Sequence, residues 1–600
     1  MYSKLSDGQR KILDYNRGQV VVKACPGSGK TYSLAARISR LLKEDLGKKG
    51  IAVISFTNIA CREIEEKLSN EFSTPVPLRH PHFLGTIDSF INTFIFLPFG
   101  HLIMKCPSRP ELVGEPHGPW SIKKFDTDYD QYFDKTTFNS DDILIRIAPY
   151  QAFHFKWNYF TLAGDVNGNI KNIISSKWTL FGKGYANQSD ANYISLKVLE
   201  KYPLIAENIA KKFDSFLIDE CQDTNDIHMK IIEVLNHKGN SNIMLIGDRD
   251  QSIFEWNEAR PELFDAKYNV WDKILLDENR RSSQLICNFI KNLSSFQEIN
   301  AVNDRVKDCP LPPIILGYKI PKKPTKKDST IVTAEESYEA FNLILNDFLK
   351  ECENNGIVVN KENVAVLYRG NASSKYLGLS SESNSYENIP WLKNFYHVKN
   401  IIKGKHMYEH GLLNKGYKLL EKSYFEGLIR PKNSMFYCNS QFIKSKIEQL
   451  GFKEYRKEIF KFINALPYTQ SKTLNSWVEE ANISLSTLKI NVKLNIDNNF
   501  GDVLIDQYFG EGLNSDRLHP FYFGTVHSVK GKTFQAVLLL LGKKSVLKNY
   551  ETILKAKTSD LKASDLEELR IVYVALSRPE ILLKMVVPDA DVSIWNSKLT

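Results

Sequence analysis

An eight-residue stretch near the start of the chain, ACPGSGKT at 24–31, constrains the fold more than any other segment. It fits the phosphate-binding loop pattern G/A-x-x-x-x-G-K-[ST], with Ala24 in the first position and Gly29, Lys30 and Thr31 closing it. The preceding run, GQVVVKA, is apolar and β-branched and predicts a buried strand, while TYSLAARISRLLKEDL after it has helical spacing. Strand, loop and helix in this order indicate a nucleotide-binding α/β domain rather than a chance match.

The residue types of this loop suit a bound triphosphate. Gly27 and Gly29, on either side of Ser28, allow successive backbone N–H groups to turn toward an anion, which a Cβ would hinder. The following helix adds the positive end of its dipole. Lys30 would neutralise the β- and γ-phosphates, and the Thr31 hydroxyl would hold Mg²⁺. We therefore expect ATP and Mg²⁺ at this loop.

A second strand supplies the acid that such a site needs. The run FLI ends at Asp219 and Glu220, and adjacent parallel strands present their carboxyl ends to one ligand. Asp219 would hold Mg²⁺, directly or through water, and Glu220 would orient and deprotonate the attacking water. The apolar runs GIAVIS and NIMLIG also end in polar clusters. The pattern predicts an α/β fold, a parallel sheet flanked by helices with its chemistry at one edge.

Composition narrows the class of protein only modestly. A chain of 600 residues is too long for one core and predicts two to four domains. The net charge of +9 permits an anionic partner without demanding one. Eight cysteines without a C-x-x-C pair argue against a zinc ribbon, an iron–sulfur cluster or a disulfide framework. The polar start and the lack of a long apolar run predict a cytoplasmic protein with no membrane segment.

Nine segments carry the pattern across nearly the whole chain. In order they are ACPGSGKT, SFTNIACREIEEKL, GTIDSF, LIDECQDTN, LIGDRDQSIFEW, LDENRRSS, VAVLYRGNASS, GTVHSVKGKTF and EELRIVYVALSR. The set resembles the superfamily 1A DNA helicases of the UvrD/Rep/PcrA type. This resemblance implies two RecA-like P-loop domains that bind ATP between them, each interrupted by a mainly helical insertion. The implied boundaries are 1–90 and 200–277 for domain 1A, 91–199 for insertion 1B, 278–375 and 518–600 for domain 2A, and 376–517 for insertion 2B.

The resemblance also implies roles around the nucleotide. Gln9 matches the glutamine that reads adenine, and Gln251 matches the sensor that contacts the γ-phosphate. Arg281 and Arg578 match two arginines that reach across from domain 2A and stabilise charge on the transferring phosphoryl group. The Pro- and Lys-rich stretch at 309–328 is expected to be a surface loop of domain 2A.

A further set matches the family's contacts with single-stranded DNA, which combine a basic groove with aromatic stacking. Phe254 and Trp256 match the stacking pair. The other matching positions are Phe56, Thr57, Asn58, Thr86, Ser89, Thr525 and His527. The alternative for the two aromatic residues is core packing.

Four positions depart from the family pattern. Arg280 stands where a tyrosine commonly stacks on adenine, and Thr533 follows KGK where the family has KGLEF. Asp88 replaces a histidine and would repel a phosphate, and Asn257 replaces the arginine after the stacking pair. These positions lie outside the set formed by Lys30, the acids and the two arginines. We therefore expect intact ATPase chemistry and altered handling of DNA.

The resemblance implies an ATP hydrolase that moves 3′ to 5′ on single-stranded or partly duplex DNA. Insertion 2B looks short, so the chain is expected to translocate well and to unwind poorly without a partner. A rival is a DNA-stimulated ATPase or sensor subunit of a nuclease-containing antiphage complex of the Gabija type. A metabolic P-loop kinase is disfavoured by the paired arginines. The chain ends soon after its last motif, so a fused nuclease domain is not expected.

Overall fold

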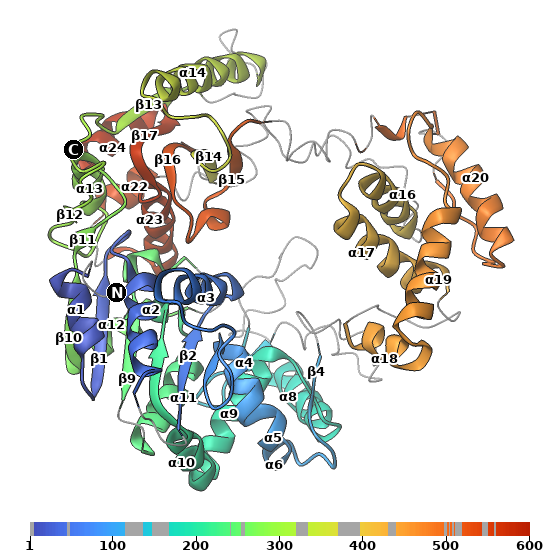
Figure 1. The fold of residues 1–600 in the computed structure, drawn as a ribbon, viewed down its shortest axis with the longest axis horizontal. Coiled ribbons are helices and arrows are strands. Elements are labelled where there is room, and N and C mark those ends of the chain that lie inside the picture. Colours follow the sequence, from blue (N-terminus) through green and yellow to red (C-terminus); the bar gives the residue numbers. More distant parts are fainter. Residues whose placement is uncertain are drawn as a thin grey trace. The chain divides into compact units, whose positions relative to one another are not determined.

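The computed structural model describes residues 5–44, 49–113, 136–146, 167–239, 242–253, 259–319, 334–369, 396–429, 440–496, 501–502, 504–506, 509, 519–542, 550–556 and 560–599. The chain forms two compact units (Figure 1). Unit 1 comprises Met1–Leu112, Gln131–Leu377 and Phe521–Thr600, and unit 2 comprises Val113–Asp130 and Gly378–Pro520. Each unit is described by itself.

Unit 1 contains a six-stranded parallel sheet in the order β10-β1-β9-β8-β2-β3. Its strands are β1 (Gln19–Ala24), β2 (Gly50–Ser55), β3 (Phe83–Thr86), β8 (Phe213–Ile218), β9 (Ile243–Gly247) and β10 (Asp272–Leu276). Every residue of β2 and β9 is buried, as expected for strands covered on both faces. The predicted strands therefore lie side by side and end at one edge.

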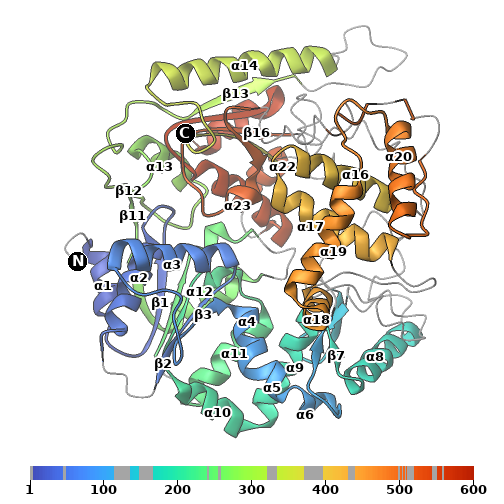
Figure 2. The same ribbon diagram turned by 45° about the vertical axis from the view of Figure 1, so that its right-hand side comes forward.

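Helices that precede or follow these strands in sequence flank the sheet. They are α1 (Asp7–Asp14), α2 (Lys30–Leu41), α3 (Asn58–Phe72), α10 (Pro203–Lys212), α11 (Asp226–His237) and α12 (Pro261–Val270). Helices α2 and α3 pack against each other (Figure 2). Their apolar side chains join those of β1 and β2 in one core, which includes Val22, Leu34, Ile38 and Leu68. This packing fixes α2 at the end of β1, where the phosphate-binding loop lies.

A second parallel sheet in unit 1 has five strands in the order β13-β17-β16-β14-β15. They are β13 (Ile314–Tyr318), β14 (Val364–Arg369), β15 (Tyr522–Thr525), β16 (Phe534–Leu541) and β17 (Pro579–Pro588). Its helices are α13 (Gln284–Lys291), α14 (Ala334–Asn354), α22 (Tyr550–Lys555), α23 (Ala563–Leu576) and α24 (Val592–Leu599). Two RecA-like parallel sheets flanked by helices confirm the predicted fold class.

The expectation of a surface loop at 309–328 is wrong for part of that stretch. Ile314–Tyr318 forms the edge strand β13 and pairs with β17 alone. The run IILGY is apolar, and the prolines lie just before it, outside the hydrogen-bonded strand. Prolines at an edge cost little because the outer side of the strand has no partner to lose.

Most of the remaining elements of unit 1 lie between β3 and β8 in the sequence. They are α4 (Ile87–Ile91), a π-helical turn (Asn92–Phe96), α5 (Leu97–Phe99), α6 (His101–Met104), β4 (Glu111–Leu112), β5 (Thr136–Phe138), β6 (Leu144–Arg146), α8 (Asn167–Gly182), β7 (Tyr185–Ala186) and α9 (Gln188–Lys201). The short strands β11 (Glu278–Asn279) and β12 (Asn300–Ala301) pair between the two large sheets in sequence. Of the described helices, none is both long and apolar enough to cross a membrane.

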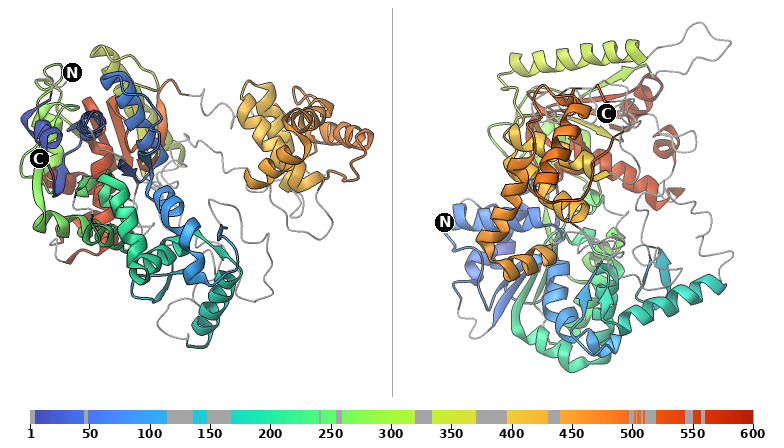
Figure 3. Two further views of the ribbon diagram at one scale, coloured as in Figure 1. Left: turned by 60° about the horizontal axis from the view of Figure 1, so that its bottom comes forward. Right: turned by 90° about the vertical axis from the view of Figure 1, so that its right-hand side faces the viewer.

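Unit 2 is helical in its described part (Figure 3). It contains α16 (Tyr396–Glu409), α17 (Leu413–Ser423), a π-helical turn (Tyr424–Leu428), α18 (Ser440–Leu450), α19 (Phe452–Ala465) and α20 (Leu474–Thr487). These helices share a core around Trp477, Tyr455 and Phe462. The division into 1A, 1B, 2A and 2B at the stated boundaries remains a prediction.

Candidate nucleotide site and nucleic-acid interface

The phosphate-binding loop turns between β1 and α2 in a conformation that requires glycine at two positions. Gly27 and Gly29 have φ values of 68° and 79°. A Cβ on Gly27 would lie 2.7 Å from the Cβ of Arg281, and one on Gly29 would lie 2.7 Å from Nε2 of Gln9. Both the backbone conformation and the close neighbours therefore exclude larger residues.

A pocket of about 300 Å³ opens at this loop. It is lined by segments from both sheets of unit 1: Cys25, Gly27, Ser28, Gly29, Lys30, Thr31, Tyr32, Glu63, Lys67, Glu220, Gln251, Arg280, Arg281, Gly531, Thr533, Arg578 and Glu580. Lys30 and Arg578 come from opposite ends of the sequence and line the same cavity. Ala24 lies just below it as the last residue of β1.

Lys30 and Glu220 form an ion pair at the floor of the pocket. Nζ of Lys30 lies 3.2 Å from Oε1 of Glu220. Burial disfavours the charge of Lys30, but Glu220 and Asp219 outweigh it and raise the lysine pKa. Burial likewise disfavours the charge of Glu220, yet Lys30 and then Lys530 lower its pKa. Glu220 is therefore ionised at neutral pH, which is the form that a general base requires.

Asp219 has the features of a metal ligand. Its Oδ1 is buried and has no hydrogen-bond partner in the described part of the chain. Burial and the adjacent Glu220 raise its pKa, so a cation beside it would relieve an unfavourable charge. Thr31, whose hydroxyl donates to Glu63, lines the same pocket. An unpartnered carboxylate oxygen and a hydroxyl are hard oxygen donors of the kind that Mg²⁺ binds, so these residues fit the ion.

Two guanidinium groups, the buried Arg578 and the half-buried Arg281, face the pocket without a carboxylate ion pair among the described residues. Arg281 donates to the backbone oxygen of Ser577 at 2.9 Å, and Arg578 donates to the backbone oxygen of Val574 at 2.8 Å. Burial lowers the pKa of both, with Arg281 adding to the effect on Arg578, whose pKa falls to about 9. Two arginines crowded together in this way are suited to a multiply charged anion.

The two predicted glutamines, Gln251 and Gln9, contact different parts of the site. Gln251 accepts from Arg578 at 2.9 Å and donates to Asp248 at 2.7 Å, so it links the first sheet to the second. Gln9 is buried, accepts from the Ser6 N–H at 3.2 Å and donates to the Ser28 oxygen at 3.0 Å. Gln9 therefore holds the loop directly, and its adenine contact remains a prediction.

The predicted DNA contacts on the first sheet lie at the carboxyl ends of β2 and β3. Thr57 caps α3 by accepting from the Ala60 N–H at 3.1 Å, and Thr86 caps α4 by accepting from the Ser89 N–H at 3.1 Å. Asn58 is exposed at the start of α3, and Phe56 is half-buried. Because β2 and β3 are paired neighbours, these side chains share one edge of the sheet.

Asp88 is held by two residues that the sequence did not single out. Nδ2 of Asn192 donates to Oδ1 of Asp88 at 3.0 Å, and Nε2 of His228 lies 3.6 Å from the same oxygen. The His228 ring also packs edge-on against Phe56, with centroids 5.7 Å apart. An imidazole from α11 thus lies beside the position where the family motif carries its own histidine. No local sequence pattern connects the two positions, so only the fold could reveal this.

On the second sheet, Thr525 ends β15 and His527 lies in the turn after it. Burial and Arg369 lower the pKa of His527, and its ring donates to the backbone oxygen of Ile253. Ile253 immediately precedes 254–258, and Phe254 and Trp256 lie outside the described residues. The structure therefore brings His527 to the start of the predicted stacking segment.

Further links between the two sheets were also missed. Nζ of Lys530 lies 2.6 Å from Oδ2 of Asp223, and Arg570 donates to the Ser252 oxygen at 2.8 Å. Each link joins a residue after β15 or on α23 to a residue just after β8 or β9. Glu63, which lies in the motif SFTNIACREIEEKL, was not assigned a role although it lines the pocket.

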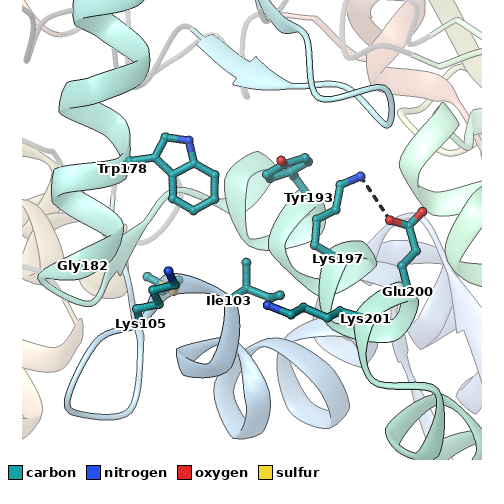
Figure 4. Close-up of a pocket in the computed structure, with 9 residues that line it drawn as sticks. Ile103, Lys105, Trp178, Gly182, Tyr193, Lys197, Glu200 and Lys201 are labelled. Carbon is teal, nitrogen blue, oxygen red and sulfur yellow. Dashed lines mark ion pairs between the residues drawn. The ribbon is translucent and has the colours of Figure 1, made fainter.

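A second and larger pocket of about 700 Å³ lies away from all predicted site residues, between α6, α8 and α9 (Figure 4). Trp178, which is 38% exposed, and Tyr193 line it together with Lys105, Lys197 and Lys201. Lys197 is paired with Glu200 at 3.1 Å. Aromatic rings next to lysines are the usual composition of single-strand binding surfaces.

The fold and pocket define a P-loop protein with two RecA-like sheets, and comparisons with known proteins show which proteins it is similar to. A family model described as the UvrD/REP helicase N-terminal domain matches residues 5–104 and 121–272. The ATP-dependent DNA helicase Rep of Buchnera aphidicola is 25% identical over 417 residues, covering 64% of this chain and 56% of the relative. The Gabija protein GajB of Bacillus cereus is 27% identical over 321 residues, covering 51% and 54%. The PcrA helicase of Leuconostoc citreum is 23% identical over 426 residues, covering 66% and 51%.

These matches confirm the resemblance to the UvrD-like proteins of helicase superfamily 1 that the sequence motifs indicate. The chain spans about half the length of the curated relatives that it matches.

Proposed function

We propose that this protein is an ATP-driven motor that moves 3′ to 5′ along single-stranded DNA. The observation that supports this most is the convergence of Lys30, Glu220, Arg281 and Arg578 on one pocket. The first two come from the first sheet, and the arginines come from segments next to the second. In this proposal the sheets are the cores of domains 1A and 2A, with insertions 1B and 2B between their halves.

The chain's own residues divide the hydrolysis of ATP among them. The loop amides and Lys30 bind the phosphates, and Thr31 and Asp219 would hold Mg²⁺, which supplies charge neutralisation when bound. Glu220 takes a proton from water, the water oxygen bonds to the γ-phosphorus, and the bond to the β,γ-bridging oxygen breaks to leave ADP and phosphate. Arg281 and Arg578 stabilise the charge that spreads over the phosphoryl oxygens.

Nucleotide turnover is coupled to DNA through the links between the two sheets. Arg578 contacts Gln251, and Arg570 and His527 contact Ser252 and Ile253 directly after it. These contacts would therefore transmit a shift of the second sheet after hydrolysis to the start of the 254–258 segment. In our proposal, Phe254 and Trp256 of this segment stack on bases. Alternate binding of the DNA strand by this segment and by the sheet edges at Thr57, Thr86 and Thr525 would advance the protein along the strand.

The test is ATP hydrolysis and translocation by the purified chain. Wild type should hydrolyse ATP only slowly without DNA and many-fold faster with single-stranded DNA, and its affinity for DNA should fall with salt. Lys30→Ala should lose the stimulated turnover, while Lys11→Ala, a matched change on α1, should keep it. Displacement of streptavidin from biotin at the 5′ end but not the 3′ end of an oligonucleotide would show the direction. Displacement from the 3′ end would contradict it.

A second candidate is a DNA-stimulated ATPase subunit that depends on a nuclease partner and unwinds little alone. The similarity to the Gabija protein GajB favours it. A strand-displacement assay on a forked duplex separates the two functions. Unwinding by the isolated chain supports a free helicase, whereas DNA-stimulated hydrolysis without unwinding supports the partner-dependent subunit.

A further inference from the structure

Unit 2 contains a cluster of metal-ligand side chains far in sequence from the nucleotide pocket. His406 lies in the last turn of α16, and His410 follows one helical turn later, just beyond its end. Asp506 comes from a distant segment. One ligand atom from each of these three side chains lies within 4.8 Å of the others. We propose that His406, His410 and Asp506 bind a first-row divalent cation, with Zn²⁺ as the preferred ion.

Asp506 is placed by the backbone around it. Residues 501–502 and 504–506 run beside 471–475, because the Asn475 N–H donates to the Gly501 oxygen at 2.9 Å and the Ile505 N–H donates to the Lys472 oxygen at 2.8 Å. Oδ2 of Asp506 accepts from the Ser471 N–H at 2.9 Å. One oxygen therefore fixes the carboxylate, and the other is left for a different partner.

That second oxygen points at the histidines. Oδ1 of Asp506 is buried, has no hydrogen-bond partner among the described residues and lies 3.6 Å from Nδ1 of His406. A buried carboxylate oxygen without a partner is costly in the absence of a cation.

The two imidazoles contact each other with their planes tilted by 44°. Their ring centroids are 4.0 Å apart, and Nδ1 of His410 lies 2.8 Å from the backbone oxygen of His406. This contact requires a proton on Nδ1 of His410 and leaves the lone pair on its Nε2.

A second layer of groups supports the cluster. Oγ1 of Thr469 lies 3.1 Å from Nδ1 of His406 and donates to Oε2 of Glu409 at 2.6 Å. Oε1 of Glu409 lies 3.4 Å from Nζ of Lys405. Carboxylates behind ligating histidines are usual in zinc sites. Asp506 and Glu409 are acidic and Lys405 is basic, so these three side chains near the cluster carry a net charge of −1. This negative charge favours the binding of a dication.

The ligand chemistry selects the kind of ion. Two imidazole nitrogens and one carboxylate suit Zn²⁺, Co²⁺ or Ni²⁺, whereas Mg²⁺ and Ca²⁺ prefer oxygen alone. Zinc bonds of about 2.0–2.1 Å in a tetrahedron place ligand atoms about 3.3 Å apart. His410 is exposed and free to close the remaining distance by rotation of its side chain. The bound ion would join α16 to the segment at Asp506 and stabilise unit 2.

The experiment uses the full chain, treated with a chelator and free of nucleotide. Calorimetric titration with Zn²⁺ should show one bound equivalent, and Co²⁺ should give visible d–d absorption without sulfur charge transfer. Zinc should raise the melting temperature by several degrees. His410→Ala and Asp506→Asn should each weaken binding by at least tenfold and abolish the rise. Asp506→Asn keeps the acceptor for Ser471, so its fold is preserved.

The matched control is His237→Ala, because His237 is also an exposed histidine at the end of a helix, α11. It should bind like wild type. The absence of zinc binding by wild type, equal affinity in the two site variants, or a cobalt spectrum dominated by cysteine sulfur would each overturn the proposal. None of these results depends on ATP hydrolysis, so this inference and the proposed function fail separately.

Discussion

The nucleotide pocket and the predicted DNA edge are built in opposite ways, although both lie at strand ends of unit 1. In the pocket, Arg281 and Arg578 donate to backbone carbonyls, Arg578 also donates to Gln251, and Asp219 keeps one buried oxygen without a partner among the described residues. At the DNA edge, the hydroxyl oxygens of Thr57 and Thr86 already accept hydrogen bonds from the helices that they cap. The pocket therefore holds charges that need a ligand, whereas the edge is complete before DNA arrives.

This difference shows where sequence change is tolerated. In the pocket, the charged groups are buried or half-buried and act on one another, so a substitution there disturbs several groups at once. At the edge, Asp88 is 44% exposed in its side chain, and its carboxylate accepts from Asn192 and lies 3.6 Å from Nε2 of His228 on another helix. Single substitutions in the pocket should therefore change the rate of ATP hydrolysis by orders of magnitude. Single substitutions at the edge should change the affinity for DNA by small factors.

The largest expected effect comes from Arg578→Ala. Removing a guanidinium that stabilises the transferring phosphoryl group should lower the DNA-stimulated rate of ATP hydrolysis by about 10³–10⁵-fold. Phosphate release under saturating ATP measures it. Arg305→Ala, an exposed arginine near the second sheet, is the control and should hydrolyse ATP at the wild-type rate. A loss below tenfold for Arg578→Ala would place this arginine outside the chemistry.

The next effect comes from Glu220→Gln. Loss of the general base should lower turnover by about 10²–10⁴-fold while ATP still binds. The variant also removes the negative partner of Lys30, so nucleotide affinity should stay equal or rise. Equilibrium binding of a fluorescent ATP analogue separates affinity from turnover, with Glu353→Gln as an exposed control. Unaltered turnover in Glu220→Gln would mean that another group activates water.

The smallest effect is expected at the edge. Asp88→Asn removes a negative charge but keeps an oxygen for Asn192, so single-stranded DNA should bind about fivefold more tightly at low salt, equivalent to about 1 kcal/mol. The gain should shrink at high salt because exposed charges are screened. Fluorescence anisotropy with a labelled oligonucleotide measures both. Equal affinity of Asp88→Asn, wild type and the exposed control Asp304→Asn would show that DNA does not approach Asp88.

The sequence predicted those parts of the fold that depend on local patterns. Apolar runs located β1, β2, β8 and β9, and the loop pattern placed α2 directly after β1. The motifs identified Lys30, Glu220, Gln251, Arg281 and Arg578, which line the pocket, but not Glu63 or Glu580, which also line it. The sequence did not predict the contact of His228 with Asp88, the pairing of Lys530 with Asp223 or the edge strand β13. These depend on which helices and strands become neighbours, and no spacing along the chain records that.

The central claim is that Lys30 and Arg578 act on one phosphoryl group. The most direct test is a double-mutant cycle on the single-turnover rate of ATP hydrolysis with saturating DNA, using Lys30→Ala, Arg578→Ala and the combined variant. Groups that act as a unit are strongly non-additive, so the double variant should be within about tenfold of the slower single variant. Two losses that multiply in full, or a wild-type rate in Arg578→Ala, would contradict the claim.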